Sequence, residues 1–398
     1  MDKWESNEEI KIFREYLRIP SVHPDIDYTA CVEFLKRQAD SLNLPVEVVY
    51  PVEKKPVVII KWLGSQSELS SIILNSHMDV VPVFPDQWTH EPFSADIDSE
   101  GRIFARGTQD MKSVGTQYLA AIRLLKSKGF RPKRTVYVTF VPDEEIGGRQ
   151  GMAEFVKTEY YRKMNVGFSL DEGGTSDSDV HHLFYAERLL WGIRLKFNGT
   201  SGHGSLLLPN TAGEKLNYVV NKFTEFRTSQ LDILAKEPSL TLGDVTTVNL
   251  TQISGGVQSN VVPPHFEAVF DMRLSITLDV VTFEKQIRGW CEEAGGGIEI
   301  DFYRKEPVVA ATKMDSSNPY WVALKASFDE LNLKVQPIVC YGATDSRFIR
   351  GQGTPAFGFS PIINTPVRLH DHDEFVYADA YLKGIEVYEN IIRKLVEI

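Results

Sequence analysis

Short apolar strands alternate with helices from about residue 44 to residue 185, and this alternation restricts the fold more than any other feature. Strands are predicted at three short apolar runs, 71–74, 135–141 and 166–170. A helix is predicted at 114–128 because apolar residues recur there at helical spacing, and similar spacing marks residues 7–44. Strands that alternate with helices indicate an α/β domain whose sheet carries helices on both faces.

The pattern changes between residues 189 and 306. Strands and helices are predicted there in the order β-α-β-β-α-β, at 191–197, 212–236, 245–253, 266–274, 280–293 and 297–303. This order is that of a ferredoxin-like unit. We therefore expect an inserted α+β domain at 189–306 and a larger, discontinuous domain formed by 1–188 and 307–398, which resumes with helices near 319–331 and 378–396. Two domains also suit a length of 398 residues, which exceeds what one hydrophobic core usually supports.

The composition excludes several classes of partner. The chain has 43 Lys and Arg against 54 Asp and Glu, a net charge of −11, so nucleic acid and anionic membranes are not expected partners. No apolar run approaches the roughly 20 residues of a membrane helix. The first twenty residues carry charges throughout and do not resemble a signal peptide. Three scattered cysteines do not suit a disulfide framework or a thiolate metal site, so we expect a cytoplasmic protein.

Polar clusters follow each of the three predicted strands. His77 and Asp79 follow the first, Glu144 and Glu145 the second, and Glu172 the third. In open α/β sheets the functional crevice lies at the carboxyl ends of the strands, so these side chains should meet at one edge. Taken singly, each has a simpler interpretation: a surface histidine beside an incidental acid, or a solvated acidic loop. The shared position of the clusters is the stronger signal.

Asp110 lies just before the predicted helix at 114–128. Its simpler interpretation is a helix N-cap, but it could also join the acidic cluster. Carboxylates that gather without a cation raise one another's pKa, and a bound metal removes that penalty. Histidine and carboxylate ligands with few or no thiols suit zinc or a neighbouring first-row metal. The sequence therefore predicts a metal site at this edge of the sheet.

Six segments, which include the polar clusters above, are similar to segments of a known family: LNSHMDVVPVF, ARGTQDMK, TFVPDEEIGG, LDEG, VNLTQISGGV and GFSPIINTPVRLHDHDE. They resemble the dinuclear zinc metallopeptidases, a family that includes aminoacylases, glutamate carboxypeptidase and related dipeptidases. The resemblance covers nearly the whole chain and is closest to the animal aminoacylases. It implies a zinc-peptidase-like catalytic domain with a mostly parallel, mixed sheet flanked by helices, and an inserted ferredoxin-like domain that acts as a lid and in dimerisation.

The resemblance also implies two Zn²⁺ per subunit and a role for each clustered residue. His77, Asp110 and Glu172 would hold the first zinc, with Asp79 holding the imidazole ring, and Asp110 would bridge to the second zinc, held also by Glu145 and His370. The H-x-x-D-E spacing selects His370 rather than His372. Glu144 is then left without a metal and would act as general base and acid.

Further candidates carry over from the same resemblance. His203 would reach the active site of the partner subunit in a homodimer and stabilise the oxyanion. Asn260 and Arg273 would bind the substrate's carboxylate or carbonyl, although a structural salt bridge explains Arg273 equally well. Either Thr344 or Arg347 would contact substrate, and the sequence does not choose between them.

The implied activity is zinc-dependent hydrolysis of N-acyl-L-amino acids to a carboxylate and a free L-amino acid. A dipeptidase or carboxypeptidase with the same metal centre is the alternative within the family. A non-catalytic metal-binding or scaffold dimer is the alternative from another class, and the presence of Glu144, both ligand sets and His203 argues against it.

Overall fold

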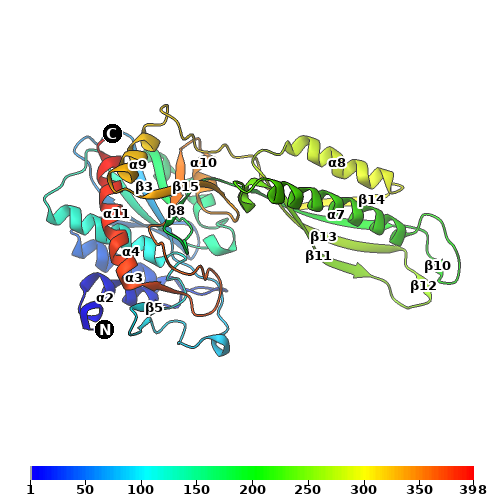
Figure 1. Cartoon of the computed structure of the whole chain (residues 1–398), viewed down its shortest axis with the longest axis horizontal. Helices are drawn as coiled ribbons and strands as arrows, with labels where there is room; N and C mark the ends of the chain where they lie inside the picture. Colours follow the sequence, from blue (N-terminus) through cyan, green and yellow to red (C-terminus); the bar gives the residue numbers. More distant parts are fainter. Residues whose placement is uncertain (1) are drawn as a thin grey trace. The chain divides into compact units, whose positions relative to one another are not determined.

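The computed structural model describes residues 2–398 and divides into two compact units (Figure 1). The first comprises the chain up to residue 185 together with 312–337 and 344–398. The second comprises 186–311 together with 338–343. Three segments expected in the larger domain lie in the second unit instead: 186–188, 307–311 and 338–343.

An eight-stranded mixed sheet forms the centre of the first unit, in the order β1-β2-β6-β3-β7-β16-β8-β15. Its strands are β1 (Val46–Val52), β2 (Lys55–Trp62), β3 (Ser71–His77), β6 (Val136–Val141), β7 (Val166–Asp171), β8 (Val180–Glu187), β15 (Lys334–Cys340) and β16 (Ala356–Phe359). The four central strands β6, β3, β7 and β16 are parallel to one another. The prediction of a mostly parallel, mixed sheet flanked by helices is confirmed.

Alternate side chains of the central strands enter two different hydrophobic cores, so the sheet is buried on both faces. Val58 and Ile60 of β2 pack in one core, and Val57 and Ile59 pack in the other. The first core is completed by α2 (Glu8–Leu17), α3 (Thr29–Ser41), α4 (Lys112–Ser127), α9 (Pro319–Glu330) and α11 (Ala378–Val396). The second is completed by the short helices α5 (Met152–Phe155), α6 (Glu159–Lys163) and α10 (Ser346–Arg350).

Shorter elements complete the first unit. They are α1 (Asp2–Glu5), β4 (Asp96–Ile97), β5 (Arg102–Phe104), β17 (Phe375–Tyr377) and the 3-10 helices η1 (Pro85–Gln87) and η2 (Glu144–Ile146). β17 pairs antiparallel with β5, with Phe375 opposite Phe104. This pairing brings the chain just before residue 375 beside the loop that follows residue 104.

The second unit has the predicted β-α-β-β-α-β order. It comprises β9 (Leu189–Asn198), β10 (Gly202–His203), α7 (Ala212–Lys236), η3 (Leu242–Asp244), β11 (Thr247–Gly255), β12 (Val261–Val262), β13 (His265–Leu274), α8 (Val280–Glu293) and β14 (Ile298–Lys305). The four long strands form an antiparallel sheet in the order β11-β13-β9-β14, and β10 pairs separately with β12. Helices α7 and α8 pack on the sheet around Phe223, Phe283 and Trp290.

Cys31, Cys291 and Cys340 are all buried. Across residues 2–398, no helix combines the length and the apolar character that crossing a membrane requires.

Candidate metal centre

The three strand ends that the sequence singled out lie at one edge of the main sheet. β3 and β6 run parallel with His77 opposite Val141, so the two strands end level with each other. The chain leaves β6 into η2, which carries Glu144 and Glu145, and it leaves β7 at Asp171, just before Glu172. The parallel register therefore brings side chains from three distant segments to the same edge.

His77, Asp110 and Glu172 form a first group of potential ligands. The Nε2 atom of His77 lies 3.0 Å from Oδ1 of Asp110 and 3.6 Å from Oε2 of Glu172. The His77 side chain is buried, whereas the two carboxylates are slightly exposed. One nitrogen and two carboxylate oxygens thus converge on one point.

Asp110, Glu145 and His370 form a second group. The Nε2 atom of His370 lies 3.3 Å from Oδ2 of Asp110 and 3.1 Å from Oε2 of Glu145. Asp110 therefore belongs to both groups and offers one oxygen to each. His370 belongs to this second group, whereas His372 does not. The ring of His372 instead packs edge-on against the ring of Phe84.

The helix-cap interpretation of Asp110 is wrong. Helix α4 begins at Lys112, two residues earlier than the predicted start, and Met111 occupies its N-cap position without a side-chain hydrogen bond. The Asp110 carboxylate is thereby left to face the two histidines.

Asp79 orients the turn that carries Glu144 and Glu145. Its fully buried carboxylate accepts the backbone N–H of Glu144 at 3.1 Å and that of Glu145 at 3.0 Å. The resemblance implied that Asp79 holds the ring of His77. Nδ1 of His77 lies 2.9 Å from the backbone oxygen of Asp79 and 3.6 Å from its carboxylate.

Burial and mutual repulsion make this cluster unfavourable without a cation. Burial raises the pKa of Glu172, and Asp110 raises it further. The same two causes raise the pKa of Glu145 to about 7. Burial and then Glu172 raise the pKa of Glu144 well above its usual range. Oε1 of Glu145 is buried and accepts no hydrogen bond within residues 2–398.

The donor set fits divalent zinc or a similar metal. Each group offers one imidazole nitrogen and two carboxylate oxygens, which are common zinc ligands, and no thiol. A divalent cation would neutralise the repulsion that raises these pKa values and would give the buried oxygen of Glu145 a partner. The residues present therefore fit two metal ions that share Asp110.

Glu374 supports the second group and was not singled out from the sequence, although it ends the H-x-x-D-E spacing. Its buried carboxylate accepts a hydrogen bond from Nη1 of Arg106 at 2.8 Å. It also accepts the backbone N–H of Gly107 at 3.1 Å and that of Gln109 at 2.6 Å. The loop that carries Asp110 is thus wrapped around the side chain of Glu374, which lies four residues after His370 in the sequence.

The remaining predicted residues are divided between the two units. Arg347 is buried in the first, where its guanidinium donates to the backbone oxygen of Gly147 at 2.7 Å, next to η2. Thr344 is buried close by and accepts the backbone N–H of Ser346. Arg347 therefore lies beside η2, and Thr344 lies beside Arg347.

His203, Asn260 and Arg273 lie in the second unit. His203 is exposed on β10, and Gly204 next to it donates its N–H to the backbone oxygen of Asn260 at 2.7 Å. Arg273 forms an ion pair with Asp271, with Nε 2.8 Å from Oδ1. The salt bridge that the sequence analysis left open for Arg273 is present.

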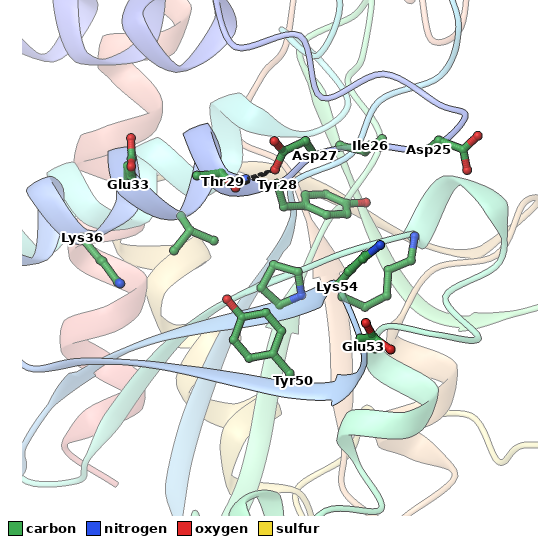
Figure 2. A pocket seen from close by; sticks show the side chains of 13 residues that line it. Asp25, Ile26, Asp27, Tyr28, Thr29, Glu33, Lys36, Tyr50, Glu53 and Lys54 are labelled. Carbon is green, nitrogen blue, oxygen red and sulfur yellow. Dashed lines mark hydrogen bonds between the residues drawn. The ribbon is translucent and has the colours of Figure 1, made fainter.

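A cavity of about 950 Å³ lies on the first unit, away from the predicted strand-end clusters. Tyr28, Tyr50 and Lys54 surround it in Figure 2. Its lining also includes Lys55, whose Nζ lies 2.6 Å from the carboxylate of Asp143, the residue before Glu144. The cavity therefore borders Tyr28 and Lys55, two side chains that contact Asp143 just before η2.

Known proteins resemble this chain along nearly its full length. It is 44% identical to aminoacylase-1A of Rattus norvegicus over 389 residues, which cover 98% of this chain and 95% of that protein. It is 44% identical to aminoacylase-1 of Homo sapiens, over 99% and 97% of the two chains. It is 42% identical to aminoacylase-1 of Dictyostelium discoideum, over 100% and 99%.

A solved structure and a family match agree with these relatives. The crystal structure of a dinuclear metal binding peptidase of the M20 family from Bacillus subtilis has the same fold, with a TM-score of 0.72, 14% identity and 98% of each chain covered. Residues 73–394 match the family described as Peptidase family M20/M25/M40. That span contains both ligand groups, from His77 to His370, and the chain therefore belongs to peptidase family M20/M25/M40.

Proposed function

We propose that this protein is a metal-dependent hydrolase that cleaves the amide bond of N-acyl-L-amino acids, giving a carboxylate and a free L-amino acid. The observation that carries the proposal is the pair of histidine–carboxylate groups sharing Asp110, with Glu144 beside them. The aminoacylase relatives, similar over almost the whole chain, supply the substrate class. A dipeptide or a peptide C-terminus is the alternative substrate within the family.

The two groups would hold two Zn²⁺ ions. His77 and Glu172 would bind the first, Glu145 and His370 the second, and Asp110 both. Zinc bound there would lower the pKa of a water molecule toward about 7 and would polarise the substrate's carbonyl.

Glu144 would move the protons of the reaction. As the water oxygen attacks the carbonyl carbon, the Glu144 carboxylate takes a proton from that water. It then gives the proton to the amide nitrogen as the C–N bond breaks, which releases the amine. Glu144 is buried next to Glu145 and belongs to neither ligand group, so its carboxylate is available to accept and return the proton.

Replacing Glu144 tests this role. Glu144→Ala should lower turnover of an N-acetyl amino acid by roughly 10² to 10⁴, the usual contribution of a general base, with zinc content unchanged. Glu144→Asp, which withdraws the carboxylate by one methylene, should also lower it. The exposed Glu68→Ala is a control and should match the wild type. Full activity in zinc-loaded Glu144→Ala protein would exclude the role.

We further propose a homodimer in which His203 acts in the partner's active site. β11 is an edge strand of the second unit's sheet, and Leu250 and Ile253 on it are exposed, so this edge can accept a second copy of the chain. His203 is itself exposed and its Nδ1 lies 2.7 Å from Oγ of Ser205, which leaves Nε2 to donate to an oxyanion.

Subunit mixing tests the action of His203 in trans. His203→Ala and Glu144→Ala proteins, each nearly inactive, should regain part of the activity when their subunits exchange, because one hybrid site then holds both groups. Fluorescent labels on the two variants would verify the exchange. Verified exchange with no recovered activity would place His203 in its own subunit's site or outside catalysis.

We also propose that the protein resides in the cytoplasm. Four further residues are proposed to bind substrate: Asn260, Arg273, Thr344 and Arg347. A panel of N-acetyl, N-fatty-acyl and dipeptide substrates, with and without a chelator, distinguishes the aminoacylase from the dipeptidase activity. KM values of alanine variants at the four positions, and cell fractionation, test the rest.

A further inference from the structure

The segment at residues 21–23 is fixed against the strand end that carries His77 and Asp79. The hydroxyl of Ser21 donates to the backbone oxygen of Met78 at 2.5 Å, and the N–H of Val80 donates to the backbone oxygen of Ser21 at 2.8 Å. The N–H of His23 donates to the backbone oxygen of Val80 at 3.2 Å. These bonds hold residues 21–23 beside residues 78–80 as a parallel bridge.

His23 adds a third hydrogen bond to the carboxylate of Asp79. Its Nε2 lies 2.8 Å from Oδ2 of Asp79, and its side chain is only 8% exposed. Oδ2 also accepts the N–H of Glu145, whereas Oδ1 accepts the N–H of Glu144. The Asp79 carboxylate therefore connects His23 directly to the backbone of both glutamates.

Tyr28, five residues further along, holds the other end of the same turn. Its hydroxyl donates to Oδ1 of Asp143 at 2.7 Å and accepts the N–H of Asp143 at 3.1 Å. Asp143 is buried and has a φ of 62°, a left-handed conformation that favours glycine. Tyr28 thus stabilises an unfavourable backbone conformation immediately before Glu144.

We propose that residues 21–28, the clamp, fix the position of Glu144, with His23 acting through Asp79 and Tyr28 acting through Asp143 as positioning residues. The proposal rests on the proposed function, because it assumes that Glu144 is the general base. It assigns a role to a segment that carries no ligand and none of the motifs noted in the sequence.

Two other side chains also reach the turn that carries Glu144: Arg347 donates to the backbone oxygen of Gly147, and Lys55 pairs with Asp143. Gly147 and Gly148, which follow η2, have φ values of 100° and 63°, conformations that glycine adopts without strain. A general base must lie about 2.6–3.2 Å from the proton it takes, and a misplacement of about 1 Å can lower the rate roughly 100-fold. A turn flanked by two glycines therefore needs contacts from elsewhere in the chain.

Variants at position 23 test the clamp. His23→Ala should lower kcat by roughly 10- to 100-fold, the usual effect of losing a group that orients catalytic residues, with KM and zinc content unchanged. His23→Gln should restore most of the loss, because its amide nitrogen can donate to Asp79 from a similar position. In an Asp79→Asn background, His23→Ala should cost much less, since His23 acts through that carboxylate.

Tyr28→Phe should also lower kcat at constant KM. Its matched control is Tyr16→Phe, because the hydroxyl of Tyr16 is buried without a hydrogen bond within residues 2–398. The matched histidine control is His182→Ala, a half-buried position on β8. Both controls should keep the wild-type kcat.

Three results would overturn the clamp: wild-type kcat in His23→Ala, a loss of kcat in proportion to lost zinc, or a His23→Gln variant as slow as His23→Ala. The proposed function fails separately. If the zinc-loaded wild type hydrolyses no N-acyl amino acid, the function is refuted, whereas an active wild type with unaffected variants refutes the clamp alone.

Discussion

Glu374→Gln is the substitution whose cost follows most directly from the structure. Glu374 is 0% exposed, and its partner Arg106 is 2% exposed. One carboxylate oxygen accepts from Arg106 and the N–H of Gly107, and the other accepts from the hydroxyl of Thr108 and the N–H of Gln109. A glutamine must turn its own NH₂ toward one of these pairs of donors. The donors that then lose this acceptor are either Arg106 and the N–H of Gly107, or the N–H groups of Gln109 and Asp110.

The expected destabilisation is about 3–5 kcal/mol, the usual cost of removing one partner from a buried ion pair. Burial raises the pKa of the Glu374 carboxyl, and Arg106 opposes that rise, so the charged pair is itself not strongly stabilising. The cost of Glu374→Gln comes instead from the guanidinium of Arg106, which stays buried without its counter-charge. Because the same loop carries Asp110, zinc affinity should also fall by roughly 10- to 100-fold.

Urea unfolding, followed with and without a chelator, measures this cost and separates it from the stabilisation that bound zinc adds. Arg106→Met is the matched variant for the other partner. The double variant Arg106→Met/Glu374→Gln should be less destabilised than the sum of the two single changes, since neither charge is then left alone. A Glu374→Gln protein within about 1 kcal/mol of the wild type would refute the interpretation of Glu374 as a buried partner on which the loop depends.

Two further predictions concern the same chain. His370→Ala should lower the zinc content from two ions to one per chain, because His370 completes the second ligand group, whereas His372→Ala should retain both ions; metal analysis after dialysis measures this. Lys394, and then Asn390, lower the pKa of Glu330 to about 2, so the stabilisation it provides is present above its ordinary pKa and is lost as the pH falls toward 2. The melting temperature of Glu330→Gln should therefore lie below that of the wild type at pH 7, and the difference should narrow between pH 5 and pH 3; a constant difference would contradict the assigned pairing.

The cluster of candidate ligands at the edge of the main sheet could be predicted from the sequence, because the residues that indicate it lie at or next to the strand ends. β3, β6 and β7 are uniformly buried or nearly so, and a polar candidate lies at or just after the end of each strand: His77 ends β3, Glu144 comes three residues after Val141 of β6, and Glu172 follows Asp171 of β7. Parallel strands then place those residues together without any knowledge of the side-chain contacts. His370 has no such signal, since it lies in a loop before the short strand β17, and only the family resemblance pointed to it.

The strands β1 and β2 were not predicted, and their prolines explain why. Pro51 and Pro56 interrupt what would otherwise be a clear apolar pattern, and proline normally argues against a paired strand. In the structure the pairing of β1 with β2 shifts register between Val49 and Val52, and Pro56 lies opposite this irregularity. The bulge accommodates the missing N–H groups, and such a bulge leaves no trace in the hydrophobic pattern.

The residues that hydrogen-bond to the candidate site from distant segments are even harder to predict from the sequence. His23 reaches Asp79 across 56 residues, and Arg106 reaches Glu374 across 268. A hydrophobic strand repeats its signal at every second residue, but a single buried polar contact between distant segments has no period and no preferred spacing. The ligands of such a centre can therefore be inferred from strand ends and motifs. The groups that hold those ligands in place, such as His23 and Glu374, are seen only once the chain is folded.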